Sequence, residues 1–89
     1  MLKEIILETL GIKNVEEGEL ITPIDTYTSK NCFQDVNLTK KIKGSVTFKK
    51  GDELEVQVVT PHEIVAYNKD KDLYVVIDKR DFSEFEDIA

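Results

Sequence analysis

Apolar and polar residues alternate through the second half of the chain, which is the pattern of half-buried β-strands. Short clusters rich in glycine, asparagine and aspartate separate the alternating runs and are typical of turns. The pattern predicts a mainly β fold with strands over residues 20–24, 42–48, 54–58, 63–67 and 73–77. Within residues 54–58, Leu54, Val56 and Val58 are expected to share one face. Residues 73–77 are almost continuously apolar, which predicts a central strand buried on both faces.

Local signals set the limits of these strands. Pro23 would confine the first strand to a sheet edge, because proline donates no ladder hydrogen bond. Gly44 interrupts the run over residues 42–48 where a bulge would bend it. Residues 68–72, Asn-Lys-Asp-Lys-Asp, predict a tight hairpin. Residues 82–85 begin and end with phenylalanine and predict a short 3₁₀ turn, which precedes a last strand at residues 87–88.

The first residues carry a helical period instead. Leu2, Ile5, Ile6 and Leu10 fall on one side of a helix, and a glycine follows at the position of a C-cap. A helix of about ten residues is marginal alone, so its apolar side must pack on the sheet. We therefore expect one domain over residues 1–89, made of a helix over residues 1–11 and a β-barrel over residues 19–89. Residues 25–41 show no clear period and predict either a strand or an ordered excursion.

A resemblance to a known fold enters at one turn and the strand after it. The residues that carry it are Phe48, Lys49, Lys50, Gly51, Asp52, Leu54, Glu55 and Val56. Together with the hairpin, apolar strand and 3₁₀ turn that follow, they make residues 45–88 resemble a Src-homology-3-like barrel. The resemblance implies a small five-stranded barrel, and we expect the N-terminal α-helix to pack on it. It does not carry over proline-rich ligand binding, which needs aromatic ridges, because the chain has no tryptophan.

Composition limits the function classes. The 89 residues carry a net charge of −6, with one cysteine and one histidine, so neither an internal disulfide nor a Cys/His zinc cluster is expected. Apolar runs are far shorter than the ~20 residues that span a membrane. Glu4 and Glu8 interrupt the first apolar stretch, unlike a signal peptide. We expect a cytoplasmic protein of a bacterium, a phage or another mobile element, with no cofactor and no membrane contact.

No spacing of side chains supports an enzyme or a metal site. His62 is expected in an exposed turn, and Cys32 is expected to be a small buried residue rather than a reactive thiol. Asn68-x-Asp70-x-Asp72 has the first half of a calcium-loop pattern, but Leu73 stands where that loop needs glycine and Lys79 where it needs glutamate. This pattern therefore predicts a hairpin and no metal ligand.

The first candidate binding surface is the acidic C-terminal region, where aromatic and carboxylate side chains alternate. Our main hypothesis is a regulator or inhibitor that binds another protein, or a second copy of itself, through this region. Its residues are Asp81, Phe82, Glu84, Phe85, Glu86 and Asp87. The other interpretation is that the two phenylalanines fill the core and the carboxylates are solvated.

The second candidate surface is a run of lysines between two acidic parts of the chain. Residues 40–50 contain five lysines and no acidic residue, and such a stripe can follow the phosphates of a nucleic acid. The residues are Lys40, Lys41, Lys43, Lys49 and Lys50. Alternatively, they are the solvated faces of strands and a turn. Because the whole chain is acidic, nucleic-acid binding is the secondary hypothesis.

Overall fold

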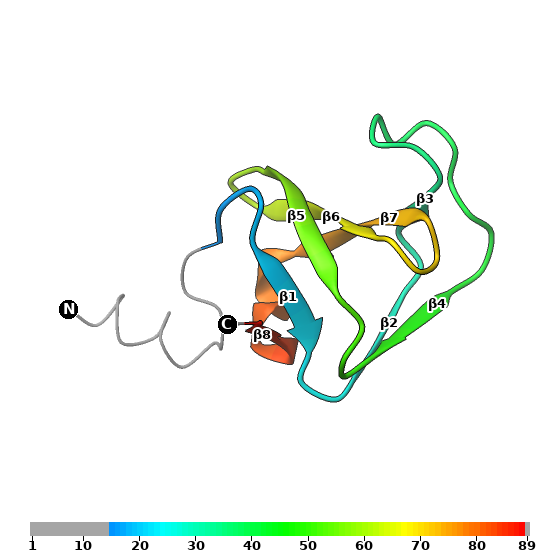
Figure 1. Ribbon diagram of the computed structural model, residues 1–89. Helices are drawn as coiled ribbons and strands as arrows, with labels where there is room; N and C mark the ends of the chain where they lie inside the picture. Colours follow the sequence, from blue (N-terminus) through cyan, green and yellow to red (C-terminus); the bar gives the residue numbers. More distant parts are fainter. Residues whose placement is uncertain (1–14, 89) are drawn as a thin grey trace.

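The computed structural model describes residues 15–88, and the helix expected over residues 1–11 lies outside them. The described residues form a small, mainly β domain (Figure 1). Its elements are β1 (Leu20–Pro23), β2 (Thr26–Ser29), β3 (Cys32–Phe33), β4 (Val46–Lys49), β5 (Leu54–Val59), β6 (Glu63–Asn68), β7 (Leu73–Asp78), the 3₁₀ helix η1 (Lys79–Glu84) and β8 (Phe85–Asp87).

Two antiparallel sheets make up the domain. The larger has six strands in the order β3-β7-β6-β5-β1-β8, and β2 pairs with β4 in a two-stranded ribbon. Strands β5, β6 and β7 follow one another as hairpins, whereas β8 returns after η1 to lie beside β1. In the described residues the six-stranded ladder ends at β3 and β8 and does not close, so no closed barrel is seen.

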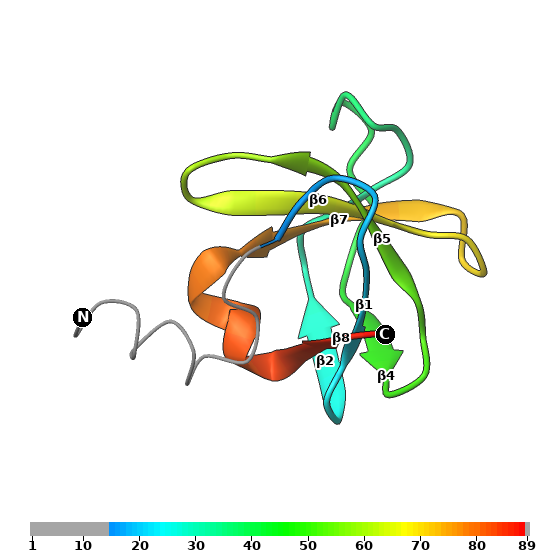
Figure 2. The ribbon, with the colours of Figure 1, turned by 60° about the vertical axis from the view of Figure 1, so that its left-hand side comes forward.

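The core lies between the ribbon and the inner face of the larger sheet. Phe48 of β4 has no exposed surface and pairs with Tyr27 of β2, and the Tyr27 ring lies 4.6 Å from the ring of Phe85 on β8. From the sheet, Leu54 and Ile64 are among the side chains with no exposed surface. In Figure 2 the two-stranded ribbon of β2 and β4 lies below the β6–β7 hairpin, and η1 lies at one side.

The strands expected over residues 54–58, 63–67 and 73–77 are confirmed as β5, β6 and β7, each extending one residue further. The prediction that β7 is buried on both faces is wrong. Leu73, Val75 and Ile77 are buried, but Tyr74 and Val76 are only half-buried, because one face of β7 lies outside the core.

The predicted edge position of β1 is also wrong, since β1 lies between β5 and β8. Its pairing with β5 covers only Leu20 and Ile21, so Pro23 lies beyond that ladder. On the β8 side, Leu20 O accepts a hydrogen bond from Ile88 N, and Ile24 N donates one to Glu84 O. Bonded positions alternate along an antiparallel pair, so Pro23 lies at a position between them. Proline is therefore tolerated because no partner requires its missing N–H.

The bulge lies in β5, not at Gly44. The register shifts between Val56 and Val58, so that Val58 pairs with Val65 while Val59 packs against the core. Val58 is 37% exposed, and the expectation that it shares a face with Val56 is wrong. The expected strand over residues 42–48 is shortened to β4, and Gly44 (φ 81°) lies in a bend ahead of it.

Residues 25–41 contain β2, β3 and an ordered excursion between β3 and Lys41. The Asp35 carboxylate accepts hydrogen bonds from Thr39 N at 2.9 Å and from Lys40 N at 2.8 Å. The Thr39 hydroxyl also donates to it, and these bonds lower the pKa of Asp35. The excursion is thus closed by one acidic side chain, as Asx turns are.

Asn68, the first residue of the rejected calcium pattern, fixes the hairpin between β6 and β7. It is 1% exposed; its Nδ2 donates to Glu53 O at 3.1 Å, and its Oδ1 accepts from Lys71 N at 2.8 Å. Asp72 closes the turn with a positive φ of 52°. The buried asparagine side chain therefore joins the residue ahead of β5 to the turn between β6 and β7, and both of its polar ends have partners.

Replacing Asn68 by alanine is expected to lower the free energy of unfolding by about 1–3 kcal/mol, because a carbonyl and an amide lose their partner. Urea denaturation of Asn68→Ala measures this loss. The control is Asn37→Ala, an exposed loop position that is expected to change stability by less than about 0.5 kcal/mol. Equal effects of the two substitutions would contradict the role given to Asn68.

Candidate functional site

The aromatic members of the acidic C-terminal region are core residues. Phe82 is 6% exposed, and Phe85 has no exposed surface and packs on Tyr27. Neither ring can touch a partner while the domain is folded. The surface of this region consists of the carboxylates, with Glu84 and Asp87 exposed and Glu86 half-buried.

Two of these carboxylates are already engaged within the domain. Asp81 accepts a 2.8 Å hydrogen bond from the hydroxyl of the buried Tyr27. Burial of Tyr27, together with this bond, raises the pKa of the tyrosine well above its usual range. Glu86 lies 4.0 Å from the Lys50 ammonium in an exposed pair, which contributes at most about 1 kcal/mol. The region is therefore weaker as a binding surface than its sequence indicates.

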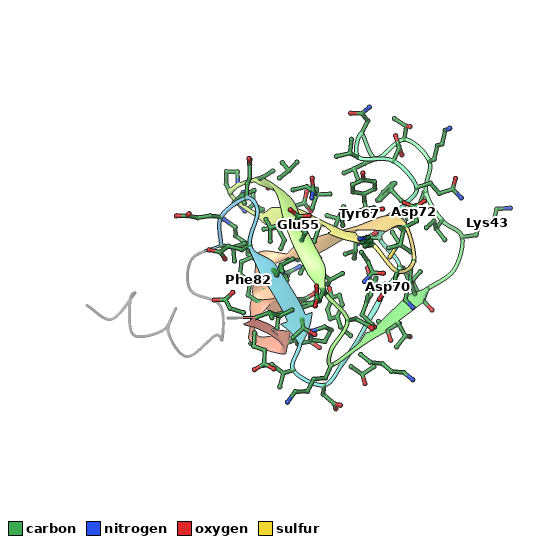
Figure 3. The ribbon with its side chains drawn as sticks, viewed as in Figure 1. Lys43, Glu55, Tyr67, Asp70, Asp72 and Phe82 are labelled. Atoms are coloured by element: carbon green, nitrogen blue, oxygen red, sulfur yellow. The ribbon has the colours of Figure 1, made fainter. Side chains whose placement is uncertain are left out.

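The lysine stripe is divided by the fold. Lys40, Lys41 and Lys43 lie ahead of β4, whereas Lys49 and Lys50 lie at its far end. At about 3.3 Å per residue, Lys43 and Lys49 are separated by up to about 20 Å, roughly twice the screening length at physiological salt. All five are exposed, and Lys43 projects outward from the segment ahead of β4 (Figure 3).

A lysine that sequence reasoning missed joins one end of the stripe. Lys30, which follows β2, lines a hollow of about 360 Å³ together with Lys41, Ile42, Lys43 and Gly44. The bridge between Phe33 and Lys41 folds the excursion back and brings Lys30 to this place. No local pattern signals the contact, because it depends on the pairing at both ends of the excursion.

The outer face of the larger sheet carries a second, unexpected surface. Residues directly opposite on neighbouring strands point to the same side of a sheet. One row across β1, β5, β6, β7 and β3 consists of Leu20, Glu55, Tyr67, Tyr74 and Phe33. A second row consists of Val58, Val65 and Val76. We call the seven apolar members of the two rows the tyrosine face.

Contacts within the tyrosine face make it continuous. The rings of Tyr67 and Tyr74 lie 4.9 Å apart, and Val65 is only 7% exposed between its neighbours. Leu20 is 38% exposed and Val58 37%, although both are large apolar side chains. Figure 3 shows Glu55 and Tyr67 close together over β5 and β6. The face is thus apolar and partly aromatic: Leu20 and Val58 are exposed, and Phe33, Tyr67, Tyr74 and Val76 are half-buried.

Carboxylates surround this face. They are Glu53, Glu55, Glu63, Asp72 and Asp78, and the cations among them are Lys41, which pairs with Phe33, Lys69 and Arg80. The Tyr67 hydroxyl donates to Asp72 at 2.7 Å, which raises the pKa of Tyr67. Arg80 donates to Asp78 from its backbone and its guanidinium, and these bonds lower the pKa of Asp78.

A cleft of about 140 Å³ opens at the β1 end of the tyrosine face. Its lining residues are Leu20, Glu53, Glu55, Tyr67 and Lys69. Small-molecule sites are typically 300–1,000 Å³, so this cleft has room for one side chain rather than for a cofactor. It combines two carboxylates with an aromatic ring and an aliphatic wall.

The remaining chemical groups form no further site. Cys32 is 1% exposed, and burial raises the pKa of its thiol, so it remains a protonated core residue. His62 is exposed in the turn before β6, as expected. Within residues 15–88 no group of three or more histidine, cysteine, aspartate or glutamate side chains is placed to hold a metal ion. The described helix, η1, is too short to cross a bilayer.

Comparison with known proteins gives no assignment: no family model, no curated protein and no solved structure matches this chain. The functional argument therefore depends on the geometry of the surfaces described above.

The bond between Tyr27 and Asp81 predicts a dependence of stability on pH. The folded state raises the pKa of Tyr27 above its unfolded value of 10.0, so its contribution is fully present below that pH and is lost as the pH rises further. We expect the free energy of unfolding, measured by urea denaturation, to fall above about pH 10. Tyr27→Phe is expected to make this fall smaller.

The control is Tyr74→Phe, whose hydroxyl makes no hydrogen bond with a described residue. It is expected to leave the decline at high pH unchanged. If Tyr27→Phe and the unmodified protein lose stability in parallel above about pH 10, Tyr27 is not the titrating group.

Proposed function

We propose that this protein is a non-enzymatic domain that binds another protein, and that the tyrosine face is its binding surface. The observation that carries the proposal is the pair of adjacent apolar rows on the outer face of the sheet. Scattered exposed apolar residues are normal on any protein, whereas a contiguous apolar patch marks an interaction surface. Tyrosine and phenylalanine are also enriched in protein interfaces.

The strand order supports a Src-homology-3-like architecture for this domain. The strands β1, β5, β6, β7 and β8 follow the order β7-β6-β5-β1-β8, and η1 precedes the last strand. The turn at Lys49–Asp52, which carries the resemblance in the sequence, connects the ribbon to β5. The proposed binding surface is nevertheless independent of that family's proline-binding groove, because it lies on the outer face of β5–β6–β7.

The acidic C-terminal region is a secondary part of this proposal. Its exposed carboxylates, Glu84 and Asp87, can contribute long-range attraction to a basic partner. They offer no apolar anchor, because Phe82 and Phe85 are buried. We expect binding energy to come from the tyrosine face, since large apolar and aromatic side chains carry most of it in protein interfaces.

The variant Val58→Lys/Tyr74→Lys tests this surface. Both positions point away from the core, so the fold is expected to survive, which a nuclear magnetic resonance spectrum checks. A partner captured by cross-linking in cells of the source organism would be purified and titrated by calorimetry. We expect the variant to bind it at least about 30-fold more weakly, the effect of losing interface hot spots.

The control is Thr28→Lys, at an exposed position of the ribbon, which is expected to bind the partner as the unmodified protein does. Equal affinities of the unmodified protein and the double variant would exclude the tyrosine face. A strictly monomeric protein that forms no stoichiometric complex would exclude the protein-binding function itself.

A second function, nucleic-acid binding, is favoured by one observation, the hollow between Lys30, Lys41 and Lys43. None of these three lysines forms an ion pair within 4.0 Å of another described residue, so their charges are available to phosphates. The proposed phosphate site is therefore the end of the stripe that lies ahead of β4, together with Lys30, and no longer the whole stripe over residues 40–50. Affinity for single strands would then fall with salt, with a logarithmic slope of about −2 for three contacts.

The test compares Lys30→Glu/Lys41→Glu/Lys43→Glu with Lys49→Glu/Lys50→Glu in binding to a labelled single-stranded oligonucleotide at low salt. We expect the triple variant to lose binding and the double variant to keep most of it. Loss of binding in both variants would indicate a diffuse effect of charge, and no binding by the unmodified protein would remove this function.

A further inference from the structure

We propose that the partner held by the tyrosine face is an amphipathic segment with an apolar stripe and basic flanks, and that one arginine of it enters the cleft beside Tyr67. This inference rests on the proposed protein-binding function. It goes further because it states the chemistry of the occupant. Three features of the face lead to it: the sign of its surrounding charge, a pair of like charges across two strands, and the composition of the cleft.

The charge around the face is mainly negative. Five carboxylates surround the apolar rows, against the three cations Lys41, Lys69 and Arg80. Arg80 is already bonded to Asp78, with its Nη2 at 3.1 Å from the carboxylate. A partner with basic side chains beside its apolar stripe would complete this charge pattern, and electrostatic complementarity of this kind favours correct partners over wrong ones.

Two carboxylates on the face lie directly opposite each other. Glu63 of β6 pairs with Asp78 of β7, and like charges at such positions destabilise a sheet. Arg80 compensates Asp78, but Glu63 is exposed and forms no ion pair within 4.0 Å of a described residue. A basic side chain of the partner would supply the missing cation at this point.

The cleft fits the end of an arginine side chain. Glu53 and Glu55 offer carboxylates on its wall, the Tyr67 ring offers a surface for stacking, and Leu20 packs against an aliphatic stem. Guanidinium groups bind carboxylates through paired hydrogen bonds and stack on aromatic rings, which ammonium groups do less well. Lys69 also lines the cleft, but the carboxylates outnumber it.

Other occupants fit this charge pattern less well. A second copy, docked face to face, would bring two faces surrounded mainly by carboxylates together, which costs affinity. The chain's own residues 1–11 contain Lys3 and two glutamates, so they bring no excess of positive charge. Both occupants are therefore outcomes that the experiment must distinguish.

The probes are two synthetic helical peptides with the same leucine stripe, one with arginine on both flanks and one with glutamine. Each is titrated at low salt into the full chain, labelled with ¹⁵N. The arginine peptide is expected to shift the amide signals of Leu20, Tyr67 and Val76, and to bind at least about tenfold more tightly than the glutamine peptide. This advantage is expected to shrink as salt is added.

Matched variants locate the effect. Glu55→Gln/Glu63→Gln is expected to remove most of the preference for arginine while leaving binding of the glutamine peptide unchanged. Glu84→Gln/Asp87→Asn, which removes the same charge from the C-terminal region, is expected to leave the preference intact. If the second pair abolishes the preference and the first does not, the charge recognition lies elsewhere and the inference is overturned.

The remaining outcomes separate this inference from the proposed function. Equal binding of both peptides on the tyrosine face overturns the inference but leaves protein binding standing. If neither peptide shifts signals of the face while Val58→Lys/Tyr74→Lys still binds the natural partner more weakly, the inference is likewise overturned and protein binding stands. Shifts that depend on protein concentration alone identify a second copy as the occupant. Tighter peptide binding in Ile6→Asp identifies residues 1–11 as the occupant.

Discussion

The packing of the β2–β4 ribbon on the inner face of the larger sheet determines the rest of the structure. Phe48, Tyr27 and Phe85 meet there, and each buried aromatic side chain is worth about 1.5–3 kcal/mol. A single sheet of short strands cannot bury one face by itself, so a second layer is required. Here the ribbon supplies that layer on one side, and the described core contains no residue of the tyrosine face on the other.

This one-sided arrangement explains why the outer face is the best candidate for binding. Its tyrosines and valines have the size of core residues, yet Val58 is exposed and Tyr67, Tyr74 and Val76 are only half-buried. The C-terminal region has the opposite character, because its aromatic side chains face inward and Asp81 is held by Tyr27. Both regions contain aromatic and acidic residues, and the side of the sheet on which the aromatic side chains lie decides their role.

The sequence was sufficient to predict the elements that depend on local pattern. Alternation locates β5, β6 and β7, and turn residues locate the hairpin over residues 68–72. Buried Cys32 and exposed His62 also follow from their neighbours. The prediction that β7 is buried on both faces failed, because a continuous apolar run does not show whether a second layer covers the outer side of the strand.

The candidate surfaces were predicted less well, because they depend on pairing between distant residues. The tyrosine face requires Leu20, Tyr67 and Phe33 to align across five strands, and no window of the sequence contains them together. The hollow beside Lys41 likewise needs Lys30, which only the bridge at Phe33 brings near. Charge counting found the lysines but could not show that β4 divides them.

The bulge at Gln57 has an evolutionary consequence. The single additional residue there is accommodated between Val56 and Val58 without a partner in β6, while Leu54, Val56 and Val59 keep their places inside. A deletion of Gln57 would therefore straighten β5 in a single mutational event and leave Val58 opposite Val65 and Val59 opposite Ile64. Lineages of this domain can lose the bulge in this way without exchanging the inner and outer side chains of the strand.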